Sequence, residues 1–289
     1  MSKLLFIVNP LSGGIDKKKL LRKVEKNLRH PYEVAFTDRP GHATQLAREA
    51  DADIVVAVGG DGTVNEVAAG LMGTGKALAI IPCGSGDGLA LHLGISRRPG
   101  KTVRVLNDGV VTSMDCGLMD GKPFFSVAGV GLDADVAWEF ARAGHRGLWT
   151  YISLAWKLWQ HFQPQTYTLD IDGKILETRA VFVTVGNSNQ WGNQARIADL
   201  ASVQDGLLNL VIVKPFRTLD IPLLAAKLML GRAHTSRRVQ TLTGRHVTIG
   251  RPSPGPAHFD GDPIQKGTQI ELEVVPEALR VLVPRNRKI

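Results

Sequence analysis

The residues of this chain with the most evident chemical use lie in the run GGDGTVNEV, which spans residues 59–67. The run follows an apolar, strand-like segment at 53–58 and leads into a helical pattern. Glycine reaches backbone angles that are closed to other residues and lets backbone amides approach a polyphosphate, while Asp61 adds one carboxylate among them. This combination suits the binding of a nucleoside triphosphate at a turn between a strand and a helix.

Two more glycine-rich turns follow strand-like segments in the same part of the chain. The segment at 4–8 runs into NPLSGG, and the segment at 77–81 runs into PCGSGDG. Because ligands gather at the carboxyl ends of parallel strands, we expect the three turns to line one site. The plain structural alternative is a tight turn with Thr63 and Glu66 as a capping box, which leaves Asp61 unexplained.

The order of segments places these turns in the first of two domains. Strand-like runs alternate with helical periodicity up to about residue 110, which is typical of a layered α/β domain with a largely parallel sheet. The rest has short β-rich runs, Asp-Gly turn pairs and helical insertions near 134–162 and 219–230. We predict an α/β nucleotide-binding domain over 1–112 and an antiparallel β-sandwich domain over 113–278.

The composition indicates a globular protein with an anionic partner. Of the 289 residues, 44% are hydrophobic, and the formal net charge is +8. The charge favours nucleotide phosphate, nucleic acid or the negative cytoplasmic face of a membrane. No aromatic-basic recognition motif for RNA or DNA is present, so no nucleic acid partner is expected. The most apolar stretch, 221–230, is broken by Lys227, so no transmembrane segment is predicted.

The cysteines and histidines argue against a disulfide framework and a zinc site. Cys83 and Cys116 have neither metal-ligand spacing nor a disulfide pattern, which favours a reduced, cytoplasmic compartment. The eight histidines are scattered without a close pair. Any metal is therefore expected to have oxygen ligands.

An aromatic-rich segment places four large side chains at helical spacing: Trp149, Ile152, Trp156 and Trp159. Packing in the core is the better single explanation for such a stripe. Contact with a lipid chain or a bilayer surface is the alternative, because basic residues such as Lys157 are interspersed.

The motifs together resemble a known family. GGDGTVNEV, NPLSGG, TDRPGHA at 37–43 and PCGSGDGLA at 82–90 resemble the diacylglycerol kinase catalytic family, which includes bacterial lipid kinases and sphingosine kinases. The resemblance continues through GVGLDADV at 129–136, QDGLLNL at 204–210 and FDGDP at 259–263, so it covers nearly the whole chain. It implies ATP and Mg²⁺ as cofactors and a lipid hydroxyl as the phosphoryl acceptor.

NAD kinases share GGDGT and a related N-terminal fold, and they are the main competing class of enzyme. Their second asparagine-glutamate pair lies well downstream, whereas Asn65 and Glu66 follow GGDGTV directly here, as in the lipid kinases. Phosphorylation of a nucleotide therefore ranks second. A nucleotide-sensing protein without catalysis is the non-enzymatic alternative.

Carried over residue by residue, the resemblance assigns the ATP site to the three turns and Thr37. The residues expected to line it are Asn9, Pro10, Ser12, Gly13, Thr37, Gly59, Gly60, Asp61, Gly62, Thr63, Val64, Asn65, Gly84 and Ser85. The same resemblance suggests that the C-terminal segment, 279–289, returns to the first domain.

Two carboxylates are candidates for the catalytic group that accepts the proton of the lipid hydroxyl. The family's Asp-Gly-Glu near the C-terminus supplies one, and its position is Asp262 here, one methylene shorter. In sphingosine kinases the role is assigned to the aspartate of the GDG turn, which is Asp61. Either group meets the need to orient a weakly acidic hydroxyl towards the γ-phosphoryl group. For Asp262 a role in the turn beside Asp260 and Gly261 is the structural alternative.

The resemblance also assigns a metal loop and lipid contacts. QDGLLNL resembles the loop that holds a structural Mg²⁺ in bacterial diacylglycerol kinases, which assigns the metal to Asp205 with Ser202 and Leu207, although an Asp-Gly hairpin turn explains the same residues. The candidate contacts to the lipid head group are Asp87, Asp133 and Asp135.

The identity of the lipid stays open between diacylglycerol and a sphingoid base. Ala137 stands where sphingosine kinases have an acidic residue. Since both lipids are found in bilayers, we expect a cytoplasmic protein with peripheral membrane association. A homodimer is compatible with the sequence, which does not fix the oligomeric state.

Overall fold

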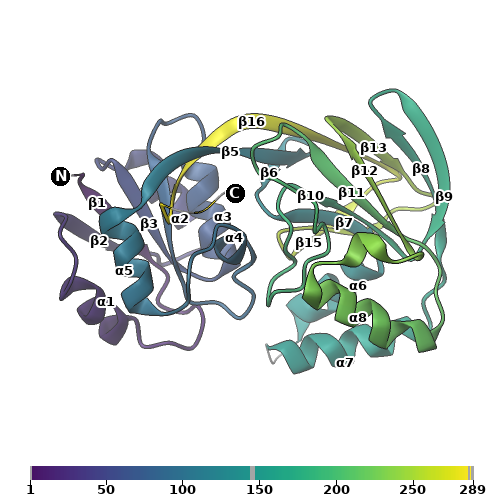
Figure 1. The fold of residues 1–289 in the computed structure, drawn as a ribbon, viewed down its shortest axis with the longest axis horizontal. Helices are drawn as coiled ribbons and strands as arrows, with labels where there is room; N and C mark the ends of the chain where they lie inside the picture. The colour runs from purple at the N-terminus through teal and green to yellow at the C-terminus, as the bar shows by residue number, and fades with distance from the viewer. Residues whose placement is uncertain (1, 144–146, 286, 288–289) are drawn as a thin grey trace. The chain divides into compact units, whose positions relative to one another are not determined.

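The chain folds into two compact units, shown in Figure 1. The computed structural model describes residues 2–143, 147–285 and 287. The first unit comprises Met1–Asp115 with Pro276–Ile289, and the second comprises Cys116–Val275. Two long strands, β5 (Val110–Met119) and β16 (Gln269–Val283), contribute residues to both units. The predicted fold class is confirmed, with a mixed α/β first unit and an antiparallel second unit.

A parallel sheet in the order β2, β1, β3, β4 forms the centre of the first unit. Its strands are β1 (Leu4–Val8), β2 (Tyr32–Phe36), β3 (Ile54–Gly59) and β4 (Ala77–Pro82). Every residue of β3 and β4 is buried, as expected for strands covered on both faces. The C-terminal end of β16 pairs with β4 in parallel through Arg280 and Val281. Residues 286, 288 and 289 of the predicted C-terminal segment lie outside the described residues.

Helices cover both faces of this sheet. They are α1 (Lys17–Glu25), α2 (His42–Glu49), α3 (Asp61–Leu71), α4 (Gly88–His92) and α5 (Pro99–Asp108). On one face, Val24 of α1 and Leu106 of α5 join the apolar side chains of the strands. On the other, α2 and α3 pack against each other and against β1 and β3. The glycine-rich turns are thus held between a buried sheet and the starts of helices.

The capping box predicted at the start of α3 is wrong. The helix begins at Asp61, and its N-cap, Gly60, has no side-chain cap. Glu66 therefore lies too far along the helix for a capping box, which needs the acid three residues after the cap. Its carboxylate instead accepts the N–H groups of Gly41 (3.0 Å) and Ala43 (3.2 Å) at the start of α2. Glu66 thus caps a neighbouring helix.

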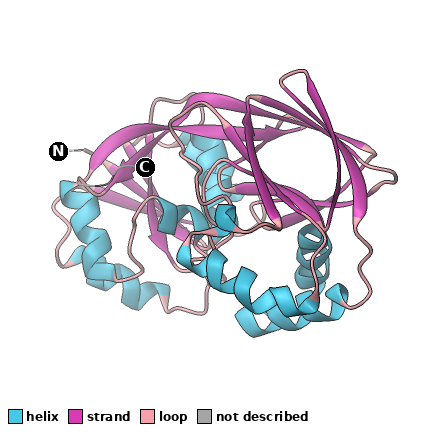
Figure 2. Cartoon of the chain, turned by 45° about the vertical axis from the view of Figure 1, so that its right-hand side comes forward, coloured by secondary structure: helices cyan, strands magenta, loops and turns pink. Residues whose placement is uncertain are grey.

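The second unit contains two antiparallel layers of strands, magenta in Figure 2. One layer has the order β12, β11, β10, β7, β14, β15, and the other joins β9, β8 and β13 to β16, with β5 and β6 beside it. The strands are β6 (Lys122–Phe124), β7 (Val127–Gly131), β8 (Gln165–Ile171), β9 (Lys174–Ala180), β10 (Phe182–Gly186), β11 (Leu208–Val213), β12 (Val239–Gly244), β13 (His246–Gly250), β14 (Gly255–Phe259) and β15 (Asp262–Lys266).

Alternation along the strands separates two apolar cores in this unit. In β11, Leu210 and Ile212 face the core between the two layers, whereas Val211 and Val213 face a second core on the opposite side of the six-stranded sheet. Helices cover that second side: α6 (Leu132–Arg142), α7 (Leu148–Trp159) and α8 (Ile221–Leu230), with the short turns η1 (Thr218–Asp220) and η2 (Ala233–Thr235). None of the described helices is long and apolar enough to cross a membrane.

Core packing of the tryptophan stripe is wrong for most of its members. Trp149 is 82% exposed, and Ile152 and Trp156 are about half exposed. Trp159 alone of the four packs inward, where its ring stacks on Phe216 at 4.3 Å between centroids. The helical period places Trp149, Ile152 and Trp156 on one face, but it does not tell whether protein or solvent covers that face.

Three of the predicted Asp-Gly pairs form tight hairpin turns. At Asp120-Gly121, Asp172-Gly173 and Asp260-Gly261 both residues have positive φ angles, as primed two-residue turns require. Each aspartate also accepts backbone N–H groups from another strand or turn: Asp120 from Glu271, and Asp172 from Arg245 and His246. The turn residues thereby fix one hairpin to the next.

Candidate nucleotide and phosphoryl-transfer site

The three glycine-rich turns lie together at the carboxyl ends of β1, β3 and β4. The first turn is joined to the second because the Asn9 side-chain amide donates to the Thr63 hydroxyl (3.1 Å) and the Asn9 N–H donates to the carbonyl of Val58 (3.2 Å). The second is joined to the third by the Cys83 N–H, which donates to the carbonyl of Gly59 (2.8 Å). The predicted convergence of the turns is thus present in the fold.

The turns approach so closely that two positions require glycine. A Cβ on Gly84 would lie 2.9 Å from the Cα of Gly60. Gly13 has a φ of +67°, and a Cβ there would lie 1.6 Å from the carbonyl oxygen of Cys83. Both distances are shorter than carbon atoms tolerate, so the glycines allow backbone to pack on backbone.

Asp61 binds the second turn to the third. Its two carboxylate oxygens accept the N–H groups of Gly88 (2.8 Å) and Asp87 (2.9 Å). Burial raises the pKa of Asp61, while these two N–H groups favour the charged form and oppose that shift. Since both oxygens already accept backbone N–H groups, this carboxylate has a structural task that its sequence motif did not reveal.

Asp87 performs a similar task within the third turn. Its side chain is buried and accepts the Gly84 N–H (2.8 Å) and the Nε of Arg97 (2.7 Å). Burial and the neighbouring Asp61 raise the pKa of Asp87 to about 6. Arg97 also donates to the carbonyls of Ser85 and Gly86. As a contact to the lipid head group Asp87 stays a prediction, and its partners here are all in the first unit.

The start of α3 offers backbone donors to an anion. The first N–H groups of a helix have no partner within the helix, and the helix dipole favours negative charge there. In α3 the first intrahelical bond is from the Val64 N–H to the carbonyl of Gly60, and Gly60 provides no side-chain cap. A Cβ on Gly62 would meet no atom within 4 Å. The turn therefore has room beside its amides for a phosphate group.

A buried cation lies beside the first turn. The side chain of Lys17 is almost fully buried at the start of α1, and its ammonium donates to the carbonyl of Ser12 (2.6 Å). Thr37 is placed on the neighbouring strand end by its N–H, which donates to the carbonyl of Val8 (3.0 Å). Lys17 was not predicted as a site residue, because three consecutive lysines are typical of the exposed surface of a helix.

The residues predicted to line the ATP site differ in how far they are exposed. Pro10, Gly62 and Ser85 are exposed, whereas Thr63 and Val64 are buried at the start of α3. Val64 therefore offers only its backbone to this turn. Asn65 is partly buried on the same helix.

In the second unit, Asp262 begins strand β15 directly after the turn Asp260-Gly261, and its side chain is exposed. Asp260 anchors that turn. Its carboxylate accepts the N–H groups of Phe125 (2.8 Å), Ser126 (2.7 Å) and Val127 (3.0 Å), and its own N–H donates to the carbonyl of Val127. The position of Asp262 thus depends on Asp260.

Asp260→Asn is expected to lower both the free energy of unfolding and kcat. The substitution replaces one carboxylate oxygen, which accepts backbone N–H groups, with an NH₂ group, which cannot accept them. The loss of stability should be about 1–3 kcal/mol. The matched control is Asp172→Asn. The carboxylate of Asp172 likewise holds a hairpin turn, because it accepts the backbone N–H groups of Arg245 and His246. Denaturant unfolding and steady-state kinetics of both variants test this. An equal loss of kcat in both would show a general effect of destabilisation.

Asp133, in the first turn of α6, belongs to a buried polar cluster. Its carboxylate accepts the Thr184 hydroxyl (2.7 Å), and one oxygen lies 3.2 Å from Nε2 of His258. A Cβ on Gly129 would lie 2.5 Å from this carboxylate, so the glycine admits it. Thr184 and His258 were missed in the sequence, where both are isolated polar residues in apolar strands.

Asp135, two residues further along α6, is half-buried. Burial and the charge of Asp133 raise its pKa to about 6, against an opposing effect of Arg251. When the pKa of an acid is higher in the folded than in the unfolded state, the protein becomes less stable as the pH rises from the unfolded-state pKa to the folded-state pKa. The ionised carboxylate of Asp135 therefore lowers the stability of the protein at neutral pH. Such perturbed acids are common in functional sites.

Asp135→Asn is expected to gain stability relative to the wild type as the pH rises from about 4 to about 6. Below this range the acid is protonated in both folded and unfolded chains, so the difference should be small. Unfolding midpoints measured across the range, with Glu177→Gln at an exposed position of β9 as the control, test this. A difference that does not change with pH would contradict the raised pKa.

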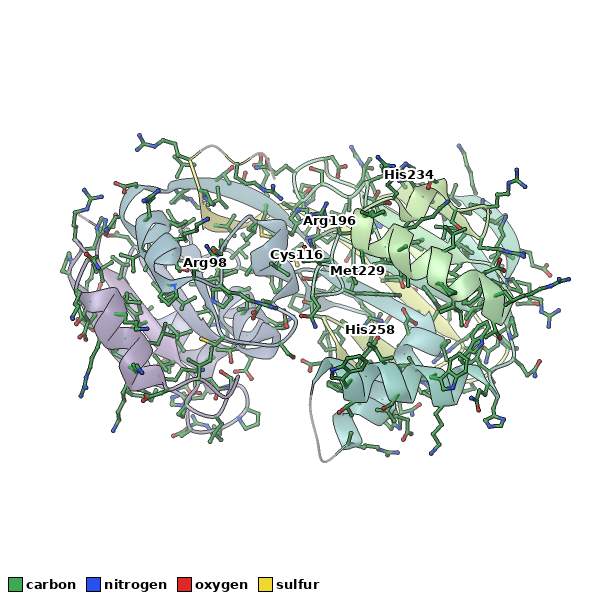
Figure 3. All side chains as sticks on the ribbon, turned by 60° about the horizontal axis from the view of Figure 1, so that its bottom comes forward. Arg98, Cys116, Arg196, Met229, His234 and His258 are labelled. Carbon is green, nitrogen blue, oxygen red and sulfur yellow. The ribbon has the colours of Figure 1, made fainter. Side chains whose placement is uncertain are left out.

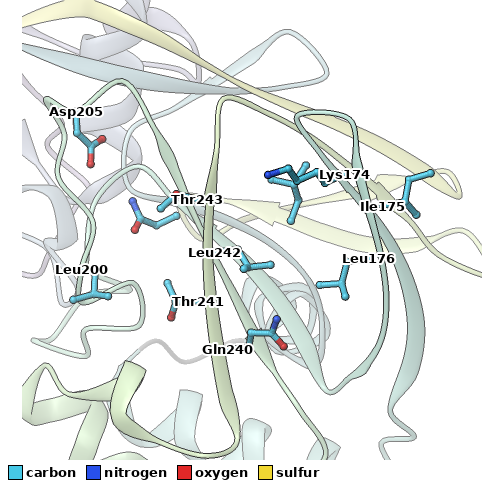
Figure 4. Close-up of a pocket in the computed structure, with 11 residues that line it drawn as sticks. Lys174, Ile175, Leu176, Leu200, Asp205, Gln240, Thr241, Leu242 and Thr243 are labelled. Carbon is cyan, nitrogen blue, oxygen red and sulfur yellow. The ribbon is translucent and has the colours of Figure 1, made fainter.

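The predicted metal loop lies at the rim of a cavity of about 640 Å³, shown in Figure 4. The Asp205 carboxylate accepts the Leu207 N–H (3.0 Å), and the Ser202 hydroxyl accepts the Gln204 N–H (3.2 Å). The cavity lies between β9 and β12 and is lined in part by Leu176, Leu242 and Asn209. Among the residues that the structure describes, no three His, Cys, Asp or Glu side chains form a metal-binding group.

Comparison with known families agrees with both units. The diacylglycerol kinase catalytic domain matches residues 3–119, and the YegS C-terminal NAD kinase beta sandwich-like domain matches residues 126–283. The chain is 30% identical to diacylglycerol kinase of Bacillus subtilis (strain 168) over 225 residues, which is 74% of each chain. The chain therefore belongs to the diacylglycerol kinase family, and it is a kinase of the lipid kinase class.

Solved structures share this fold. The crystal structure of a diacylglycerol kinase from Bacillus anthracis str. Sterne aligns with a TM-score of 0.77 at 20% identity, over 97% of this chain and 96% of that one. An NAD kinase from Archaeoglobus fulgidus in complex with ATP aligns with a TM-score of 0.54 at 13% identity, over 96% and 93% of the two chains. The NAD kinase likeness concerns the fold alone.

Proposed function

We propose that this protein transfers the γ-phosphoryl group of ATP to a hydroxyl group of a membrane lipid, either diacylglycerol or a sphingoid base. The observation that carries the proposal is the packing of the three glycine-rich turns around the start of α3. Backbone N–H groups at this helix start would bind phosphate oxygens, and the Lys17 ammonium beside the first turn would add a positive charge. The family membership supplies the class of acceptor.

The ATP residues are those that offer backbone or exposed polar groups at the turns. Gly60 and Gly62 would present N–H groups to the phosphates, and a phosphate oxygen would occupy the open space beside Gly62. Asn9 and Ser12 shape the first turn through the Asn9 side chain and carbonyl. Their role is to bind and orient the triphosphate, because phosphoryl transfer depends mainly on position and charge.

Asp262 is the better candidate for the proton acceptor. Its carboxylate is exposed and lies in a turn that Asp260 holds in place. Asp61 is partly buried, accepts two backbone N–H groups and connects two turns. In this proposal Asp262 takes the proton of the lipid hydroxyl, and Asp61 keeps the phosphate-binding turns in register.

Mg²⁺ has two proposed places, with the nucleotide and in the Asp205 loop. In the loop the ligands would be the Asp205 carboxylate and the neighbouring backbone carbonyls of Ser202 and Leu207, which are hard oxygen ligands of the kind that suits this ion. When bound with ATP, Mg²⁺ neutralises charge on the phosphates.

A magnesium site in the Asp205 loop predicts that Mg²⁺ stabilises the protein without nucleotide. The unfolding midpoint of the wild type should rise with Mg²⁺ concentration, because an ion that binds only the folded chain stabilises it. Asp205→Asn should abolish the rise, whereas Asp170→Asn at another Asp-Gly turn should not. Equal responses of wild type and Asp205→Asn would remove the metal from this loop.

The test of the proposed function is transfer of label from [γ-³²P]ATP to a panel of acceptors: diacylglycerol, sphingosine, ceramide, monoacylglycerol and NAD⁺. Label in a lipid that depends on ATP and Mg²⁺ is the expected result. Label in NAD⁺ alone would make this chain a nucleotide kinase. ATP binding without transfer to any acceptor would favour a nucleotide-sensing protein.

A further inference from the structure

Helix α8 exposes an apolar face to solvent. All of its exposed residues are apolar: Pro222, Leu223, Ala225, Ala226, Met229 and Leu230. Leu223 is 64% exposed and Leu230 is 67% exposed, whereas Leu224 packs into the core on the inner side. The surface helix of a globular protein normally turns charged and polar residues outward. The outer face of α8 therefore has the character of a contact surface.

The only ionisable residue of α8 does not change this character. The Lys227 ammonium donates to the carbonyl of Thr235 in η2 (2.9 Å), so it is directed along the unit's own surface. Figure 3 labels Met229 on the same helix. Directly before α8, Leu219 in η1 is 90% exposed.

Helix α7 also exposes apolar side chains. Trp149, Ile152 and Trp156 recur at helical spacing on its exposed side. Trp159, on the inner side, stacks on Phe216 just before η1 and donates to Thr218 (3.5 Å), so α7 lies beside the segment that leads into α8. Both helices pack onto one core cluster and one face of the six-stranded sheet. We call the exposed set the apolar platform: Trp149, Trp156, Leu219, Leu223, Met229 and Leu230.

Positive charges predominate on α7, on α8 and on the segment that contains α8. Neither α7 nor α8 contains an acidic residue. The segment 214–238 has six basic residues, including Arg217, Arg232 and Arg237, and one acidic residue, Asp220. Asp220 lies 3.2 Å from Arg238, which compensates its charge. An apolar face with a basic border matches a bilayer surface that carries anionic lipids.

We propose that the apolar platform docks this kinase on an anionic bilayer, with the leucine and tryptophan side chains among the acyl chains and the basic border at the head groups. The inference deepens the proposed function and rests on it, because a kinase acting on a bilayer lipid must reach the lipid's surface. A second copy of the chain is a poorer occupant, since a symmetric interface would bring two basic borders together.

Flotation with vesicles tests the docking. The full chain is mixed, without ATP, with vesicles of phosphatidylglycerol or of phosphatidylcholine. The wild type should float with the anionic vesicles, less with the neutral ones, and less at high salt. The double variant Leu223→Gln/Leu230→Gln should partition about a hundredfold more weakly, since burial of each leucine contributes about tenfold.

The matched control is Ile175→Gln on β9, which removes an isoleucine that is 75% exposed outside the platform. It should float like the wild type. Tryptophan emission should shift to shorter wavelength on binding to anionic vesicles, and brominated acyl chains should quench it, with the Trp149→Phe/Trp156→Phe variant lacking the effect. Flotation of the double variant at the wild-type level would overturn the proposal. The proposal would also be overturned if the wild type were a dimer, the double variant were a monomer, and neither protein bound vesicles.

A short-chain diacylglycerol dissolved as monomers separates this proposal from the proposed function. The double variant should phosphorylate it at the wild-type rate and lose activity only on long-chain lipid in vesicles. A wild type that phosphorylates the monomeric lipid but does not float would overturn the docking alone. A wild type that floats but phosphorylates no lipid would overturn the kinase proposal and leave the docking intact.

Discussion

Asp262→Asn is expected to lower kcat about a thousandfold with little loss of stability. A positioned general base contributes this order of magnitude, and an amide cannot accept the proton of the lipid hydroxyl. The side chain of Asp262 is exposed, so its replacement should change the free energy of unfolding by about 0.5 kcal/mol or less. Steady-state kinetics on a lipid acceptor, together with denaturant unfolding, measure both quantities.

Two further variants separate Asp262 from Asp61. Asp262→Glu restores the longer acid of the family pattern and should keep most of the activity. Asp61→Asn should weaken the two bonds to Asp87 and Gly88 and destabilise the protein by about 1–3 kcal/mol. Wild-type kcat in Asp262→Asn, together with normal stability and lost activity in Asp61→Asn, would make Asp61 the base.

Gly62→Ala is expected to weaken ATP binding about tenfold or more without destabilising the protein. The added methyl would meet no protein atom within 4 Å, and alanine is favoured over glycine in a helix by about 1 kcal/mol. The same methyl would occupy the space where phosphate oxygens approach the start of α3. Isothermal titration with ATP analogues and thermal unfolding measure the two effects.

Gly100→Ala is the matched control for Gly62→Ala. Gly100 is the second residue of α5, as Gly62 is the second residue of α3, and a Cβ there would also meet no atom within 4 Å. It should keep the wild-type affinity for ATP. Unchanged affinity in Gly62→Ala as well would mean that the glycines serve only the packing of the turns.

The sequence predicted the placement of the phosphate-binding turns because one local pattern determines it. Apolar runs followed by glycine-rich turns predicted the strands β1, β3 and β4. Parallel strands bring their carboxyl ends to one edge of the sheet. The pairing of Asp61 with the third turn was out of reach, because its partners lie 26 and 27 residues further along the chain. For the same reason Glu66 was assigned to its own helix and not to α2.

The surface of the second unit was the harder part to predict. Periodicity placed Trp149 and Trp156 on one face, but whether a face is covered depends on which elements pack beside it. The same limit applies to Asp133, whose partners Thr184 and His258 come from two other strands. Long-range polar contacts of this kind leave no spacing in the sequence.

Hydrogen exchange on addition of ATP and Mg²⁺ tests most directly the claim that the three glycine-rich turns bind the phosphates. Peptides that cover residues 9–14, 59–65 and 84–88 should become protected together, and Gly62→Ala should reduce this protection while Gly100→Ala keeps it. ATP-dependent phosphorylation of a lipid without protection of these three turns would contradict the account.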